Sequence, residues 1–467
     1  MMKRILLSFC FAFVTYGAFA YDFSAIAPTG QTLYYNVVDE DAQVVGGSSL
    51  FWSLVIPQSV SFGGRTLSVT SIGDSAFYNC TGLTSITIPS TITNIGLSAF
   101  ENCTGLTTVN YNATNCSASH TEQTHSGDDD WDYTEINVGN NIFTGCNNIT
   151  TINIGSSVSH IPPYIFSGLS ITSITIPSNV NSIGKMAFSN CSSLHNVQFN
   201  ANCNAATIQV IGSGVADVWS MYSVVRVFDG CDSISTVSFA ANVSNIPAFI
   251  FEGCPIRSVT IPENVETIGM GAFENCNSLE TIYFNARNCT HAGGYLDAYH
   301  GGYALITAFG GCNNISKVII GDDVTTIPSK FLLNADCNID TLTIPNSLTY
   351  IGDSAFAHLN FSVINHNATN CSYAGHYGHN WDEYDWRNNG RMINSFYGCN
   401  ISKLNIGDNV TNIPNHIFYG CSGFDTITIP ESISSIGGYA FGNCIDLTTI
   451  NYNAVNCTNM SGAFLSE

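Results

Sequence analysis

The sequence predicts a β-rich α/β solenoid, in which short coils are stacked and a β-hairpin caps the N-terminal end. Three observations predict it. An apolar motif recurs with a nearly fixed period, each copy contains a short strand pattern, and charged residues make up only 10% of the 467 residues. One copy cannot bury its own apolar side chains, whereas stacked copies place each side chain over its equivalent, about 4.8 Å away.

The repeat is marked by a phenylalanine that is followed, in most copies, by a cysteine three positions later. Neighbouring phenylalanines are mostly 22 or 23 positions apart, and every third interval is longer, at 36 to 43 positions. The larger unit is therefore a set of three coils. The phenylalanines are Phe77, Phe100, Phe143, Phe166, Phe188, Phe228, Phe251, Phe273, Phe309, Phe331, Phe356, Phe396, Phe418, Phe441 and Phe464.

Each short coil begins with a predicted strand. Apolar and polar residues alternate from Leu83 to Ile88, which is typical of a half-buried strand. Pro89 then ends the pairing, because proline has no N–H to donate. Ile95-Gly96 closes a second short extended piece, and the segment around Phe100 is predicted to be a tight or weakly helical turn.

The first 20 residues are predicted to be a signal peptide. Lys3 and Arg4 precede an apolar segment, Ile5–Val14, and Ala18-Phe19-Ala20 matches a cleavage site. The apolar segment is too short to be a membrane anchor, and no later segment has the pattern of a transmembrane helix. We therefore expect a protein that is secreted or on the cell surface.

Residues 21–49 lack the repeat. Two alternating segments, 34–38 and 42–45, flank the acidic Asp39-Glu40-Asp41 and predict a β-hairpin. The end of a solenoid exposes unpaired backbone groups, so this hairpin is predicted to be an N-terminal cap. Residues 50–467 then form the solenoid.

The copies of I-P-x-x-V-x-x-I-G-x-x-A-F-x-x-C, such as residues 88–103, resemble the BspA-type leucine-rich repeat over nearly the whole mature chain. This resemblance implies a right-handed leucine-rich-repeat superhelix with a parallel sheet on its concave side. Members of the family are mostly secreted or surface proteins of bacteria and some mucosal parasites. Several are implicated in adhesion, so the resemblance implies a binding protein and not an enzyme.

Cysteine is unusually frequent, with 18 residues, of which Cys10 lies in the predicted signal peptide. One set follows the repeat phenylalanine, as Cys103 does, and a second set follows asparagine after each third strand, as Cys116 does. Stacked copies could form disulfides, but their side chains point in parallel, which favours columns of buried thiols. Cys337 lies outside this register.

The net charge of −22 would repel a phosphate backbone, so nucleic acid is excluded as a partner. No nucleophile elbow, zinc-protease motif or phosphate-binding glycine loop is present, and no catalytic residue is predicted. The acidic segment 128–132 lacks calcium-loop spacing, and His376 and His379 lack a third zinc ligand at the usual spacing. We expect neither a metal nor another cofactor.

Long insertions follow the strand of each third coil, at 117–138, 204–226, 290–306 and 372–393. Long loops on a rigid scaffold often bind ligands, and aromatic side chains there can anchor proteins or stack on sugars. The aromatic residues predicted to bind are Trp131, Tyr133, Trp219, Tyr222, Tyr295, Tyr299, Tyr303, Trp381, Tyr384 and Trp386. The alternative is that they fold back and cover the flank of the solenoid.

A polar row on the sheet is a second candidate surface. Its members are Thr87, Thr175, Thr260, Thr343 and Thr428. Such a row could form hydrogen bonds with a ligand, although ordinary solvent-facing strands have the same composition.

The sequence therefore predicts an exported, non-enzymatic, adhesin-like protein that recognises a host or microbial protein or glycan. One alternative is a structural spacer that presents a missing C-terminal module. Another is a glycan-processing enzyme that uses carboxylates such as Asp382 or Glu383, although such chemistry needs two carboxylates at a fixed separation. The sequence defines no oligomeric state.

Overall fold

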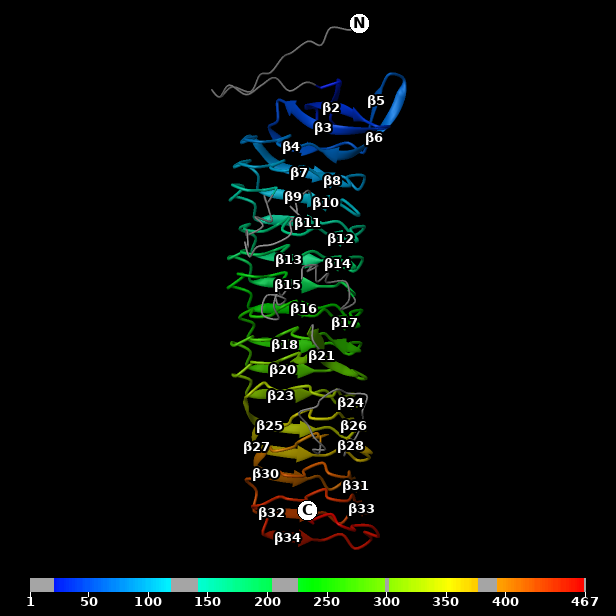
Figure 1. The fold of residues 1–467 in the computed structure, drawn as a ribbon, viewed down its shortest axis with the longest axis vertical. Helices are drawn as coiled ribbons and strands as arrows, with labels where there is room; N and C mark the ends of the chain where they lie inside the picture. The colour runs from blue at the N-terminus through cyan, green and yellow to red at the C-terminus, as the bar shows by residue number, and fades with distance from the viewer. Residues whose placement is uncertain (1–20, 119–141, 204–225, 299–301, 377–392, 466–467) are drawn as a thin grey trace, which may run out of the picture. The chain divides into compact units, whose positions relative to one another are not determined.

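The computed structural model describes residues 21–118, 142–203, 226–298, 302–376 and 393–465 (Figure 1). It divides into two compact units: unit 1 contains Met1–Val197 and Val227–Asp232, and unit 2 contains Gln198–Arg226 and Ser233–Glu467. Strands and turns make up the described ranges, in which no helix occurs. The β-rich part of the predicted fold is confirmed, and the α/β part is wrong for these residues.

Unit 1 begins with a sheet whose strands follow the order β1-β2-β3-β6-β8-β10, with β5 paired to β6. Its strands are β1 (Phe23–Ile26), β2 (Thr32–Val38), β3 (Asp41–Ser48), β5 (Ser59–Phe62), β6 (Arg65–Ile72), β8 (Asn94–Ile95) and β10 (Ser117–Ala118). Strands β2 and β3 form an antiparallel hairpin across the acidic turn, and β3 pairs in parallel with β6. The role of this hairpin as a cap remains a prediction.

The repeat strands of unit 1 stack in parallel in the order β11-β9-β7-β4. They are β4 (Trp52–Val55), β7 (Leu83–Ile88), β9 (Thr108–Tyr111) and β11 (Thr151–Ile154). Further along the chain, β12 (His160–Ile161) pairs with β14 (Ser182–Ile183). The next repeat strands are β13 (Ser173–Ile176) and β15 (Asn196–Phe199). Ile86 lies opposite Val109 and Ile88 opposite Tyr111, and all four are buried. Strand β7 ends immediately before Pro89, as predicted.

In unit 2 the main sheet is parallel and its strands follow chain order (Figure 1). They are β16 (Thr236–Phe239), β18 (Ser258–Ile261), β20 (Thr281–Phe284), β23 (Lys317–Ile320), β25 (Asn338–Ile344), β27 (Asn360–His366) and β30 (Asn400–Ile406). Strands β32 (Thr426–Ile429) and β34 (Thr449–Tyr452) form a separate parallel pair. The main ladder of unit 2 is therefore interrupted after β30.

The second extended pieces of the unit 2 coils form smaller sheets. These are β17 (Asn245–Ile246), β19 (Thr267–Ile268), β21 (His291–Ala298) and β22 (Gly302–Thr307); β24 (Thr326–Ile327), β26 (Tyr350–Ile351), β28 (Tyr373–His376) and β29 (Ile393–Asn394); and β31 (Asn412–Ile413) with β33 (Ser435–Ile436). Several neighbouring coils are thus paired at two places, as β18 with β20 and β19 with β21, which fixes the side-chain columns between them.

The repeat phenylalanines stack inside each unit. The ring centroids of Phe77 and Phe100 are 5.1 Å apart in unit 1, and those of Phe273 and Phe309 are 5.1 Å apart in unit 2, with nearly parallel planes. All four rings are fully buried. The predicted columns of equivalent apolar side chains are confirmed within each unit.

The segment around each phenylalanine is a turn and not a helix. The second residue after the phenylalanine has a positive φ in most coils, as at Asn102 (59°) and Gly145 (76°). This left-handed conformation suits asparagine and glycine and ends a right-handed helix. The tight-turn alternative is therefore correct for this segment.

The cysteine columns consist of free thiols throughout the described part of the chain. Most are buried, and the sulfur of Cys103 donates a hydrogen bond to the Phe77 carbonyl of the preceding coil, at 3.0 Å. Cys337, which lies outside the sequence register, is buried as well. The thiol interpretation is confirmed against the disulfide alternative.

Candidate functional site: the outer face of the sheet

The outward residues of the unit 2 sheet form a hydrogen-bonded polar row. Thr343, Asn365 and Asn405 lie in register on β25, β27 and β30. The Asn365 amide donates to Thr343 Oγ1 at 3.4 Å, and the Asn405 amide donates to Asn365 Oδ1 at 2.8 Å. Each asparagine has two donors and an acceptor with two lone pairs, so the row keeps capacity for a ligand.

Unit 1 repeats this arrangement. The Asn110 amide donates to Thr87 Oγ1 at 3.1 Å, and the Asn153 amide donates to Asn110 Oδ1 at 2.8 Å. The predicted threonine row is therefore part of mixed threonine and asparagine ladders. The sequence prediction named only the threonines, although asparagines occupy the equivalent position of the two coils that follow Thr87 and of the two that follow Thr343.

The remaining predicted threonines also lie on this outer face. Thr175, Thr260 and Thr428 are exposed, and Thr428 Oγ1 accepts a hydrogen bond from the Asn451 amide at 3.4 Å. Side-chain ladders of this kind stabilise the stacking of strands. The row therefore has a structural role in addition to any role in binding.

Tyr283 interrupts the polar row of unit 2. It lies on β20 between Thr260 of β18 and Ile319 of β23. The residue is 39% exposed to solvent. Lys317 is exposed at the beginning of β23, opposite Thr281. We call Tyr283, Ile319 and Lys317 the Tyr283 patch. The signal in the sequence was the strand TIYF, where most coils have a polar residue between the two apolar ones.

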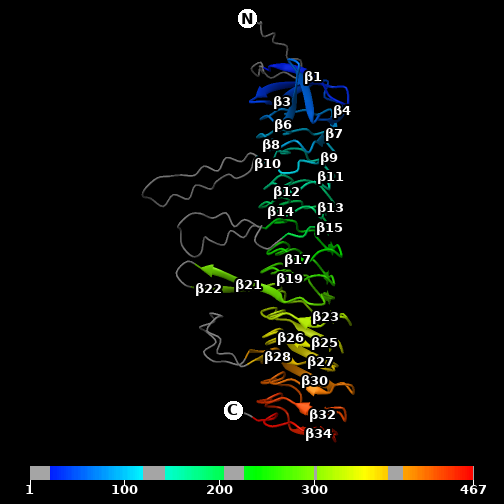
Figure 2. The ribbon, with the colours of Figure 1, turned by 90° about the vertical axis from the view of Figure 1, so that its right-hand side faces the viewer.

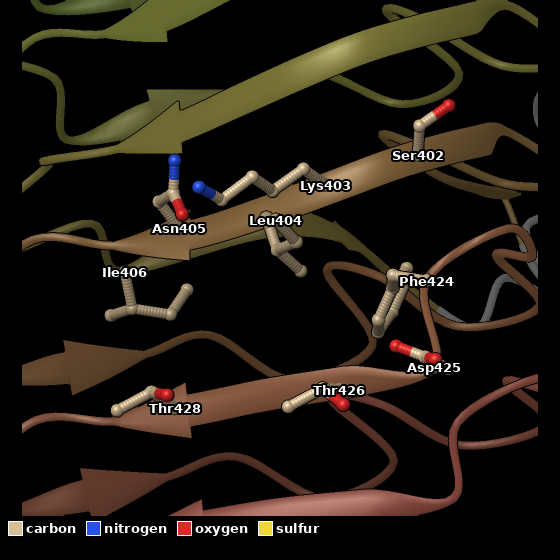
Figure 3. Close-up of a pocket in the computed structure, with 9 residues that line it drawn as sticks. All are labelled: Ser402, Lys403, Leu404, Asn405, Ile406, Phe424, Asp425, Thr426 and Thr428. Atoms are coloured by element: carbon tan, nitrogen blue, oxygen red, sulfur yellow. The ribbon is translucent and has the colours of Figure 1, made fainter.

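The gap between β30 and β32 contains a cavity of about 330 Å³ (Figure 3). We call it the β30–β32 groove. Its apolar floor is formed by the buried Leu404, Ile406 and Phe424. Its other lining residues are Ser402, Lys403, Asn405, Asp425, Thr426 and Thr428. This groove was not predicted, because both strands carry the alternating pattern of the other repeat strands.

Two of the predicted aromatic residues fall on described backbone. Strands β21 and β22 form an antiparallel hairpin in which Tyr295 lies opposite Leu305 and Tyr303 lies opposite Asp297. The beginning of β21 pairs in parallel with β19, and the hairpin then extends away from the stacked coils (Figure 2). The other eight lie outside the described residues: Trp131, Tyr133, Trp219, Tyr222, Tyr299, Trp381, Tyr384 and Trp386.

Three titratable groups inside the coils of unit 2 are poorly suited to catalysis. His366 is fully buried without a hydrogen-bond partner for either ring nitrogen, and burial lowers its pKa to about 4. Burial also raises the pKa of the Cys399 and Cys289 thiols to about 12. A thiol must ionise to act as a nucleophile, so these two cysteines are inert at neutral pH.

One ion pair is partly buried. Arg226 Nη2 lies 2.6 Å from Glu252 Oε1, and the Glu252 side chain is only 4% exposed. Burial, and then the neighbouring Glu252, raise the pKa of Glu274.

Across the described ranges, no three histidine, cysteine or acidic side chains are grouped as metal ligands would be. In those same ranges no helix is long and apolar enough to cross a bilayer.

Stacked coils with one parallel strand each, an inward phenylalanine column and a polar outer sheet face define a leucine-rich-repeat protein. A family model described as the BspA type leucine rich repeat region (6 copies) matches the chain over five ranges, residues 51–123, 131–213, 225–296, 306–377 and 392–466. The protein belongs to this family, as the sequence motif predicted.

Several solved structures are similar to this chain. A leucine-rich repeat protein from Bacteroides ovatus shares 19% identity, with 94% of this chain and 90% of that chain covered, at a TM-score of 0.34. A leucine rich cell surface protein from Faecalibacterium prausnitzii shares 20% identity, with 92% and 94% covered, at 0.29. The pneumococcal vaccine antigen PcpA shares 13%, with 93% and 89% covered, at 0.28. No curated protein matches the chain.

Proposed function

We propose that the protein is an exported, non-enzymatic binding protein that acts as an adhesin and recognises an extracellular protein or glycan. The Tyr283 patch is the observation that carries this proposal. A partly exposed aromatic ring lies there beside Ile319 and Lys317, on a face that elsewhere presents mainly amide and hydroxyl groups. Aromatic rings beside hydrogen-bonding groups are frequent anchors in protein interfaces and can stack on sugars.

The rigidity of the outer face supports the same proposal. Asn365 and Asn405 are each fixed by a neighbouring side chain, so a ligand would meet donors and acceptors that are already oriented. Less side-chain entropy is then lost on binding. Membership of the BspA-type family supports export and a surface location.

The insertions are the second proposed contact surface. The ten aromatic residues named from the sequence would add protein- or sugar-stacking contacts. The hairpin of β21 and β22 is the described example, since its backbone extends away from the coils (Figure 2).

A binding array tests the proposal. The mature chain, residues 21–467, is applied to immobilised matrix proteins and glycans, and any ligand found is titrated against Tyr283→Ala. We expect the variant to bind at least tenfold more weakly, as for an aromatic hot spot. Tyr78→Ala is the matched control, because Tyr78 is equally exposed, at 39%, and belongs to unit 1, whereas the Tyr283 patch belongs to unit 2.

The outcomes separate the two surfaces. Unchanged affinity of Tyr283→Ala would remove the sheet patch from the proposal, and an array without any retained ligand would remove the proposal itself. Replacing Trp131, Trp219, Trp381 and Trp386 with alanine tests the insertions independently.

A further inference from the structure

The parallel sheet of unit 2 opens between β30 and β32. The two coils are joined on both sides of the opening: Ile401 N–H donates to the Ser422 carbonyl before β32 at 2.8 Å, and β31 pairs with β33 after it. Beyond this bond, the described residues show no strand pairing between β30 and β32. The ladder is intact on both sides of the opening, from β27 to β30 and from β32 to β34.

The hydrogen bonds between β30 and β27 show which N–H and C=O groups of β30 point toward the groove. Gly407 N–H donates to the His366 carbonyl on β27 at 2.9 Å. Alternate residues of a parallel strand direct their N–H and C=O groups to opposite sides. The N–H and C=O groups of Ile406 and Leu404 therefore face the groove.

The same reasoning applies to β32. The Ile429 carbonyl accepts a hydrogen bond from Asn453 N–H at 3.0 Å, which directs Ile429 and Ile427 toward β34. The N–H and C=O groups of Thr428 and Thr426 then face the groove from its other side. Both lips of the groove are thus strand edges with the same spacing of donors and acceptors.

The floor of the groove sets the side-chain pattern that it would accept. The apolar side of the cavity is lined by three buried residues, Leu404 (4% exposed), Ile406 (9%) and Phe424 (2%). Lys403 and Asp425 contribute opposite charges at the exposed rim (Figure 3). An occupant therefore needs apolar groups toward the floor and polar groups toward solvent, with no strong net charge.

We propose that the β30–β32 groove binds one extended peptide segment, about four to six residues long, with apolar residues at alternate positions. The peptide would complete the ladder between β30 and β32, so that the interface between coils continues through it. Strand addition of this kind takes its affinity from main-chain hydrogen bonds and its specificity from alternate side chains. This site is separate from the Tyr283 patch, and its test does not depend on the ligand proposed there.

The probe is a labelled, end-blocked peptide with the sequence of Ser173–Ser178, SITIPS, added to the mature chain. We expect saturable binding by fluorescence anisotropy. Hydrogen exchange should slow at the amides of Leu404, Ile406, Thr426 and Thr428. The amide of Ile364, on a strand paired on both sides, is the internal control.

Two altered peptides test the two parts of the proposal. The shuffled peptide STIIPS has the same composition but places its isoleucines side by side. A second peptide carries N-methylation on its threonine, which removes one edge hydrogen bond. Each should bind roughly tenfold more weakly or worse. Thr426→Pro, which removes one N–H that faces the groove and not β34, should cause a similar loss.

The proposal is overturned if SITIPS does not bind, if both altered peptides bind as well as it does, or if its binding leaves the exchange of the four lip amides unchanged.

Discussion

The sulfur of Cys399 donates a hydrogen bond to the main-chain carbonyl of Phe356, 3.0 Å away in the preceding coil. The same bond joins Cys276 to Phe251 and Cys421 to Phe396. Cysteine is small enough for a crowded column and is a weak donor, so it fills the space and satisfies a carbonyl. The thiols therefore hold coils together without forming disulfides.

Cys399→Ala should destabilise unit 2 by about 1–2 kcal/mol, because it leaves a small cavity and removes a buried hydrogen bond. Urea unfolding measures the change. Cys457→Ala is the control: Cys457 is only half-buried and its bond to the Asn459 carbonyl is longer, at 3.5 Å. Equal losses in the two variants would contradict the proposed role of the buried thiol.

His366 should make unit 2 sensitive to acid. Burial lowers its pKa from 6.5 to about 4 in the folded protein. Between these values the unfolded chain binds a proton that the folded protein excludes, so stability rises with pH in this window and falls as pH drops toward 4. The full effect is at most about 3 kcal/mol.

His366→Ile tests this directly, because Ile344 and Ile406 occupy the equivalent positions on the two adjacent strands. Urea unfolding of the variant should show higher stability at pH 5 and a flatter dependence between pH 4 and 6.5. Ile344→Val serves as the comparison: it should cost about 1 kcal/mol at every pH and keep the slope of the parent. A slope that survives in His366→Ile would assign the acid sensitivity to other groups.

Removing one partner of the Arg226–Glu252 pair should be costly. Arg226→Ala leaves the Glu252 carboxylate buried at 4% exposure, and we expect a loss of about 2 kcal/mol, since the arginine itself is 41% exposed. The double variant Arg226→Met, Glu252→Met should recover much of that loss. Arg257→Ala breaks an exposed pair, 3.4 Å from Glu280, and should cost less than about 0.5 kcal/mol. Thermal or urea unfolding that ranks the two arginine variants equally would contradict the importance of burial.

The repeat made most of the fold predictable. The alternation around Ile86 and the spacing of Phe100 identify the strand and the inward column, because every coil imposes the same packing on its neighbours. The predicted weak helix failed because Asn102 takes a left-handed backbone conformation that the pattern alone did not specify.

The candidate sites were less predictable. Tyr283 was visible as an aromatic residue on a strand, but its exposure depends on the neighbouring coils. The groove depends on the absence of pairing between β30 and β32, which no single coil encodes. The predicted aromatic insertions stay a prediction, since eight of their ten named residues lie outside the described ranges.

Phe424 offers a physical reason for the opening. The sixth residue after the repeat phenylalanine is a leucine or isoleucine in eight other coils, namely Leu83, Leu106, Ile149, Leu194, Ile234, Leu279, Ile315 and Leu447. In the coil of Phe418 this residue is Phe424, which is 2% exposed and lines the groove. A larger ring at a position that is filled elsewhere by a smaller side chain pushes adjacent coils apart.

Phe424→Leu should therefore let β32 pair with β30. We expect hydrogen exchange at the amides of Leu404 and Ile406 to slow by about tenfold or more as they gain main-chain partners. Phe361→Leu is the matched control, because Phe361 is equally buried, at 2% exposure, but lies on the fully paired β27. It should lower stability and leave those two amides unchanged. If the same amides exchange in Phe424→Leu as fast as in the parent, the size of residue 424 does not keep the strands apart.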